Sequence, residues 1–147
     1  MTPPERAGEA RELASSWQHV GVGVHAWGPS RAEAFARAAE GVFALGVSPT
    51  HVASQETREV LAQGDSPEAL LVNWLNECLY VHEIEGFAVA RVEIDACREG
   101  FVHGVLHGEA LDPARHPVGT IVKAATHHQV EVRETADRVD VRVIVDV

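Results

Sequence analysis

The chain has 147 residues, of which 46% are hydrophobic and 23% are charged. This composition is typical of a globular domain with one hydrophobic core, and it excludes a disordered or fibrous chain. Twelve Lys and Arg against 22 Asp and Glu give a net charge of −10. Direct, tight binding of nucleic acid is therefore disfavoured, because the chain repels a phosphate backbone, and a basic protein partner is favoured instead.

Two features of the sequence concern the cellular compartment. No apolar run is long enough to span a membrane, and the N-terminal segment is charged where a signal peptide is apolar. We therefore expect a cytoplasmic protein without membrane association. Cys78 and Cys97 lie far apart and belong to no C-x-x-C pair. This spacing predicts buried thiols in a reducing compartment instead of a disulfide or a metal site.

The N-terminal region divides into an extension and the start of a domain. Residues 1–15 are polar, so we expect a flexible or helical extension before a single domain of residues 16–147. In residues 17–27, valine and alanine alternate with histidine and glycine at the period of a β-strand. Gly21 and Gly23 leave the second face of this strand bare, which allows another segment to approach closely.

Two helices are predicted from capping signals and apolar spacing. Ser30 and Glu33 form an S-x-x-E capping box, and apolar residues at helical spacing continue until Gly46. The second helix begins at Ser66, followed by a proline in the first turn, and its apolar stripe ends before Gly86. Both stripes predict helices that pack against a sheet.

The remaining segments predict strands. Residues 51–62 contain too few apolar residues for their period to distinguish a strand from a helix. Antiparallel strands are expected over residues 87–96, 101–108, 119–132 and 139–147. Short turns join the first two and the last two of these strands. The predicted fold class is α+β, a mainly antiparallel sheet with two principal helices packed on it.

The segment G-E-A-L-D-P-A-R-H, residues 108–116, concentrates acidic, basic and imidazole groups in a loop between strands. Loops on a rigid scaffold often carry function. Asp112 precedes a proline, and its carboxylate is expected to cap the following amides or to pair with Arg115. These structural roles compete with a functional role in which Asp112, Arg115 and His116 contact a partner.

A second group of polar residues is expected along one face of a later strand, namely Lys123, Thr126 and His128. Asp146 is expected on a neighbouring strand within reach of one of them. An amine, an imidazole and a carboxylate can together bind phosphate, a divalent ion or an acidic side chain. The loop of residues 108–116 is expected to fold back beside this strand, so that both groups form a single docking face for a partner. The same residues also fit a solvated sheet face.

Known catalytic motifs are missing from the sequence, which has no G-x-S-x-G and no phosphate-binding G-x-x-x-x-G-K-[ST] loop. A zinc site would need His103, His107, His127 and His128 to converge, although none has the spacing of a known zinc site. A small enzyme using Asp112, His116 and Lys123 as acid and base is one alternative. A chaperone-like interaction module is a further alternative, and an exposed apolar patch would distinguish it.

Five segments together resemble one known family. They are A-W-G-P-S-R-A-E-A-F-A-R-A-A, L-L-V-N-W-L-N-E-C-L-Y, the loop of residues 108–116, V-K-A-A-T-H-H and the closing V-I-V-D-V. In order and spacing they are similar to the archeases, small proteins that act with the tRNA-splicing RNA ligase. The resemblance covers about residues 17–147 and implies an archease-like fold, with a strand within residues 51–62. It also implies an accessory protein, not an enzyme, that promotes guanylylation and multiple turnover of the ligase in tRNA splicing and RNA repair.

The resemblance further implies a metal site, because the family holds a calcium-like divalent ion with two aspartates. Asp146, followed by Val147, matches the one near the C-terminus. The other belongs to an H-T-A-D-I-G motif in the first strand, where this chain has Gly21, and Ser48 replaces a second acidic residue. One carboxylate carries too little charge to hold a hard cation. The chain is thus expected to be a divergent member of the family in which the site for Ca²⁺ or another divalent metal can be empty. The alternative to a ligase activator is a chaperone-like interaction module that has lost both the metal site and ligase activation.

Overall fold

The structure is a computed structural model that describes residues 16–147, so the extension predicted for residues 1–15 lies outside the described residues. The elements in chain order are β1 (Ser16–Val20), β2 (Gly23–Gly28), α2 (Arg31–Gly46), the 3-10 helix η1 (Pro49–His51), β3 (Glu56–Gln63), α3 (Pro67–Glu85), β4 (Phe87–Arg98), β5 (Phe101–Ala110), β6 (Ala124–Ala125), β7 (Glu131–Glu134) and β8 (Val139–Asp146). The predicted α+β class with two principal helices is confirmed. No helix of the described residues is long and apolar enough to cross a membrane.

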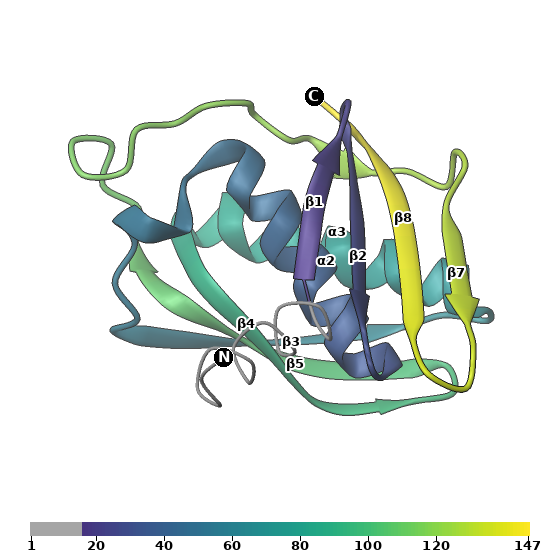
Figure 1. Ribbon diagram of the computed structural model, residues 1–147. Coiled ribbons are helices and arrows are strands. Elements are labelled where there is room, and N and C mark those ends of the chain that lie inside the picture. The colour runs from purple at the N-terminus through teal and green to yellow at the C-terminus, as the bar shows by residue number, and fades with distance from the viewer. Residues whose placement is uncertain (1–15) are drawn as a thin grey trace, which may run out of the picture.

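Two antiparallel sheets enclose the two helices. One sheet has the strand order β1-β2-β8-β6, with β7 also paired to β8, and the other has the order β3-β5-β4. Helix α2 packs on β2 of the first sheet and on β4 of the second, while α3 packs on β3. The helices therefore form a layer between the sheets, with the hairpin of β1 and β2 on one side of them (Figure 1).

Both helices begin where the capping signals predicted. The Ser30 hydroxyl accepts a hydrogen bond from the Glu33 amide, and the Ser66 hydroxyl accepts one from the Ala69 amide. Each bond satisfies an amide that has no partner within the helix. Helix α3 ends at Gly86, whose φ of 58° is the left-handed conformation that glycine adopts without strain.

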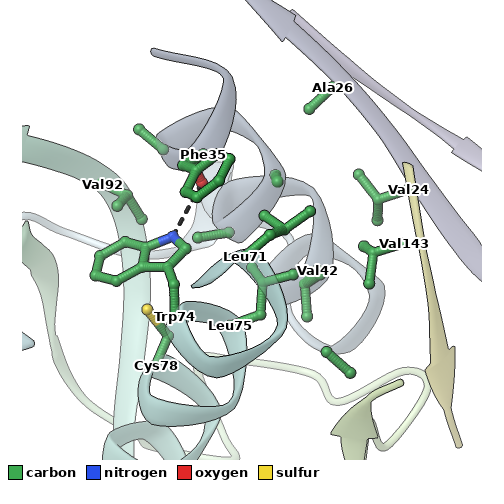
Figure 2. Close-up of a cluster of buried hydrophobic side chains, with 14 of the residues drawn as sticks. Val24, Ala26, Phe35, Val42, Leu71, Trp74, Leu75, Cys78, Val92 and Val143 are labelled. Atoms are coloured by element: carbon green, nitrogen blue, oxygen red, sulfur yellow. Dashed lines mark hydrogen bonds between the residues drawn. The ribbon is translucent and has the colours of Figure 1, made fainter. Parts of the chain in front are cut away.

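Trp74 lies at the centre of the core, between the helices and β4 (Figure 2). Its indole N–H donates to the carbonyl of Phe35 at 3.1 Å, so the ring joins α3 to α2. On β5, Gly104 makes room for the indole, because a Cβ there would lie 2.5 Å from the ring. Cys78 is buried in this core, as predicted, whereas Cys97 is only half-buried, and both are free thiols.

The prediction of one strand over residues 17–27 is wrong. Gly21, at φ 60°, and Val22 form a turn, and Val20 pairs with Gly23 across a hairpin. A two-residue turn preserves the alternation of side chains, so the period alone cannot distinguish a hairpin from one long strand.

The prediction of a strand over residues 119–132 is also wrong for most of its length. Only β6 and the first residues of β7 are strand, and the chain turns between them at Gln129, which has a φ of 55°. Lys123, Thr126 and His128 therefore do not alternate along one strand face. The strand implied within residues 51–62 is confirmed and begins at Glu56.

Candidate functional site

Three segments meet at one end of the first sheet, near the C-terminus (Figure 1). The amide of Val145 donates to the carbonyl of Val22 at 3.0 Å, which joins β8 to the hairpin turn. The amide of Lys123 donates to the carbonyl of Asp146 at 2.8 Å. The backbones of Lys123 and Asp146 thus lie side by side, although their side chains form no ion pair with each other. We call this surface, made of residues 20–22, 121–126 and 145–147, the hairpin face.

The segment that carries Lys123 is fixed by a side chain of α3. The Asn76 amide group donates to the Ala125 carbonyl at 3.1 Å and accepts from the Ala125 amide at 2.8 Å, as a neighbouring strand would. The Thr126 hydroxyl donates to the carbonyl of Ile144 at 2.9 Å. Sequence reasoning missed Asn76 as a site residue, although the W-L-N-E segment contained it. His128, by contrast, is exposed in the following turn.

The hairpin face combines one ammonium and one carboxylate with exposed apolar side chains. The side chains of Lys123 and Asp146 are exposed, and neither makes a hydrogen bond or an ion pair within residues 16–147. Four exposed apolar residues, 50 to 71% accessible, lie on this face: Val20, Val22, Ile121 and Val147. Exposed apolar surface of this kind marks sites of protein–protein contact.

The residues of the hairpin face do not fit a calcium-like ion. Gly21 supplies no ligand from its side, and a Cβ placed there would meet nothing within 4 Å. Ser48 is bonded instead to the Thr50 hydroxyl, at η1. Asp146 therefore offers a lone side-chain carboxylate, whereas calcium takes six to eight oxygens with several charged groups. Across residues 16–147, no group of three His, Cys, Asp or Glu side chains could hold a metal, so the four histidines considered for zinc form no such group either.

The loop of residues 108–116 folds into a turn attached to β5. The carboxylate of Asp112 accepts from the Ala114 amide at 3.1 Å, which is the expected cap. Arg115 does not pair with Asp112. Its guanidinium instead makes a bidentate ion pair with Glu109, with two N–O distances of 2.9 Å.

Glu109 is the centre of this turn, and sequence reasoning did not single it out. Its Oε2 also accepts from the Ala53 amide at 2.8 Å and from Nε2 of His116 at 3.0 Å. Hydrogen bonds from Arg115, the Ala53 amide and His116 lower the pKa of Glu109 to about 2. Nδ1 of His116 accepts from the Asp112 amide, so the ring carries its proton on Nε2. His116 is fully buried, and its ring is therefore not accessible to a partner.

Residues 111–123, which we call the covering segment, connect this turn to the hairpin face. They run across the C-terminal ends of both helices (Figure 1), where Gly119 donates to the Gly46 carbonyl at 2.6 Å and Leu111 to the Gly86 carbonyl at 2.7 Å. Within the part of the chain that the structure describes, no hydrogen bond or ion pair joins residues 112–116 to residues 123–128. The two predicted groups thus lie at opposite ends of the covering segment, and the structure does not bring them together as the single face that was expected.

A cavity of about 420 Å³ lies between the covering segment and the two helices. Its apolar lining includes Val42, Phe43, Val47, Leu79, Leu111 and Val122. The charged side chains that line it are Glu83 and Lys123. The cavity therefore opens beside the hairpin face, with which it shares Lys123.

A polar cluster on the first sheet was also missed from sequence. Nε2 of His25 lies 2.8 Å from Oδ1 of Asp140, and the Gln18 amide group donates to Nδ1 of His25 at 3.3 Å. Hydrogen bonds from Arg138 hold the pKa of Asp140 at about 2. The three strands β1, β2 and β8 each contribute one member, so the cluster ties them together.

Comparison with known proteins identifies the family. The model of the Archease protein family (MTH1598/TM1083) matches residues 20–147, almost all of the described chain. The chain belongs to the archease family. The archease of Pyrococcus abyssi is 34% identical over 128 residues, covering 82% of this chain and 90% of that protein. The archease of Methanosarcina acetivorans is 32% identical over 126 residues, covering 83% and 86%.

Solved structures agree with the archease assignment. The solution structure of Methanobacterium thermoautotrophicum protein 1598 has a TM-score of 0.71 and 27% identity, covering 91% of this chain and 99% of that one. The crystal structure of an archease from Thermotoga maritima, described as a possible chaperone, has a TM-score of 0.62 and covers 89% and 94%. At 15% identity the second likeness shows the fold alone. The family and the fold predicted from the sequence are both confirmed.

Proposed function

We propose that this archease-family chain is a cytoplasmic accessory protein of an RNA ligase that acts in tRNA splicing and RNA repair. It promotes guanylylation and multiple turnover of that ligase and performs no chemistry itself. The observation that carries the proposal is the hairpin face, where Lys123 and Asp146 stand without partners among exposed apolar side chains. Membership of the archease family supports the choice of partner.

The physical basis of docking is the burial of this mixed surface. Contact with a partner would remove Val20, Val22, Ile121 and Val147 from water, which is the main favourable term in protein association. The same contact would lower the local dielectric around Lys123, so its attraction to a carboxylate or phosphate of the partner would grow. Neighbours that exclude water from a charged group favour a strong contribution of that group to binding.

The predicted site residues divide between docking and support. We assign docking to Lys123 and to His128 beside it, because these side chains are exposed, and a second contact to exposed Asp112 at the other end of the covering segment. Arg115, although 53% exposed, and buried His116 are both bonded to Glu109 and hold the turn of residues 108–116, while Thr126 is bonded to the backbone of β8 and holds the hairpin face. We further propose that the chain acts without a tightly held calcium ion, because Asp146 alone cannot supply the required charge.

A second candidate function is a chaperone-like interaction module that does not activate a ligase. The exposed apolar side chains favour it, since such a patch was its expected mark. The replacement of the family's first-strand aspartate by Gly21 favours it as well.

Ligation with the ligase in place tests both candidates. RNA joining is measured under multiple-turnover conditions with purified ligase and this chain, together with co-purification of the two proteins. We expect Lys123→Ala and Val22→Ser to lower the stimulation, while Leu61→Ser, on the other sheet, leaves it unchanged. Leu61→Ser is the matched control for Val22→Ser, because the two side chains are 51% and 53% exposed. Unchanged turnover in both Lys123→Ala and Val22→Ser would contradict the proposal, and binding without stimulation would support the second candidate.

A further inference from the structure

We propose that the cavity between α2, α3 and the covering segment receives an apolar side chain that the partner protein presents between basic residues. The inference rests on the proposed accessory function and adds the chemistry of the segment that docks. It makes the cavity an anchor site beside the hairpin face.

The size and lining of the cavity fit an apolar anchor. About 420 Å³ lies within the range of sites that enclose small ligands, and such sites are mostly apolar with few polar groups. The wall is held in place by His82, whose Nδ1 donates to the Phe87 carbonyl at 2.7 Å. The His82 ring contacts Phe43 edge-on, with ring centroids 5.6 Å apart. The wall at His82 and Phe43 is therefore held in place before any occupant enters, which reduces the entropy cost of binding.

Apolar surface continues beyond the mouth of the cavity. Val118 and Ile121 belong to the covering segment and line the cavity, yet they are 52% and 71% exposed. A small molecule inside the cavity would leave most of this surface in water. A chain segment that lies across the mouth would cover it, which favours a protein as the source of the anchor.

The charge around the mouth selects basic neighbours for the anchor. Glu83 lines the cavity, and Asp112 and Asp146 lie at the two ends of the covering segment. None of these three carboxylates makes an ion pair within residues 16–147, and Lys123 is the single Lys or Arg among the lining residues. Lysine or arginine on either side of the anchor would meet this negative rim.

Short peptides test the inference without the ligase. The probe is a fluorescent, amidated heptapeptide with a central leucine between two runs of three lysines. Two further peptides replace the leucine by serine or all lysines by glutamate, and binding is followed by fluorescence anisotropy. We expect the leucine–lysine peptide to bind about tenfold or more tightly than the serine peptide, because burying a leucine contributes about 1.5–3 kcal/mol and 1.4 kcal/mol is tenfold. The glutamate peptide should not bind.

Two variants locate the bound peptide. Glu83→Lys should weaken binding by about tenfold, whereas Glu77→Lys, on the same helix and outside the cavity lining, should change it by less than about twofold. Thr120→Trp should fill the cavity from the covering segment and remove the preference for leucine. All three positions are exposed or at the surface, and thermal melting checks that the variants fold.

Several results would overturn the inference. Equal binding of the leucine and serine peptides would mean that charge alone attracts them, and binding of the glutamate peptide would exclude the negative rim. If Glu83→Lys and Thr120→Trp stimulate the ligase fully while Lys123→Ala does not, the partner does not place a side chain in the cavity. The proposed accessory function would then still stand. If the peptides discriminate as expected but the ligase is not bound, the accessory function fails and the cavity stands.

Discussion

Replacement of His116 tests whether this buried side chain stabilises the loop of residues 108–116. In His116→Ala, Glu109 loses the hydrogen bond from Nε2, and the Asp112 amide loses its acceptor Nδ1. The first bond, to a charged group, contributes about 1.5–3 kcal/mol, and the second about 1 kcal/mol. Because the ring is fully buried, water cannot replace either partner without entering the turn. We expect a loss of about 3 kcal/mol in the free energy of unfolding.

Thermal and urea unfolding of the purified protein measure this loss. For a chain of this size, about 3 kcal/mol corresponds to a fall in Tm of about 6–12 °C. His128→Ala is the matched control, because His128 is exposed, and it should leave the Tm within about 1 °C. A His116→Ala protein with unchanged Tm but reduced binding to the ligase would refute the structural role and return His116 to the docking surface.

Three further predictions follow from the described contacts. Gly21→Asp should create saturable calcium binding with a Kd of about 10⁻⁴–10⁻³ M by titration calorimetry, because aspartate tolerates the left-handed φ of 60° and open space surrounds this position. Gly21→Asn, the control, should not bind calcium. Equal calcium binding by the unmodified chain would contradict the argument that the residues of the hairpin face do not fit this ion. Because the folded-state pKa of Glu109 is about 2, its stabilising contribution is complete above its ordinary pKa of 4.5 and is lost as the pH falls from 4.5 toward 2. Glu109→Gln should therefore show a shallower acid-induced loss of stability in urea unfolding, and an identical pH profile would disprove this. Gly104→Ala should destabilise the protein by about 1–3 kcal/mol in the same assay, since its Cβ would lie 2.5 Å from the Trp74 ring, and full stability would show that the ring can move aside.

Local signals explain which parts of the fold could be predicted. The helix starts at Ser30 and Ser66 were predictable because a capping hydroxyl and its amide lie three residues apart. The hairpin at Gly21 was missed because alternation continues through a two-residue turn. The irregular path after residue 119 was not predictable, because Asn76 of a distant helix replaces a strand partner there.

The same distinction holds for the candidate site. Asp146 was expected on a strand beside the segment of Lys123, Thr126 and His128, and the pairing of β6 with β8 places its backbone next to that of Lys123. The role of Glu109 was not predictable, since its partners include the Ala53 amide, 56 residues away in the chain, besides Arg115 and His116 of the same turn. A sequence motif does not show which backbone amide donates to a side chain, so the pairing of the Glu109 carboxylate with its donors could be seen only in the structure.

Hydrogen–deuterium exchange of the chain, alone and in complex with the purified ligase, tests most directly which surface docks. The account predicts slower exchange in the complex at the hairpin face and in the covering segment, with little change along β3 and β5. Protection of β3 and β5 instead, with unchanged exchange at residues 20–22 and 145–147, would contradict it.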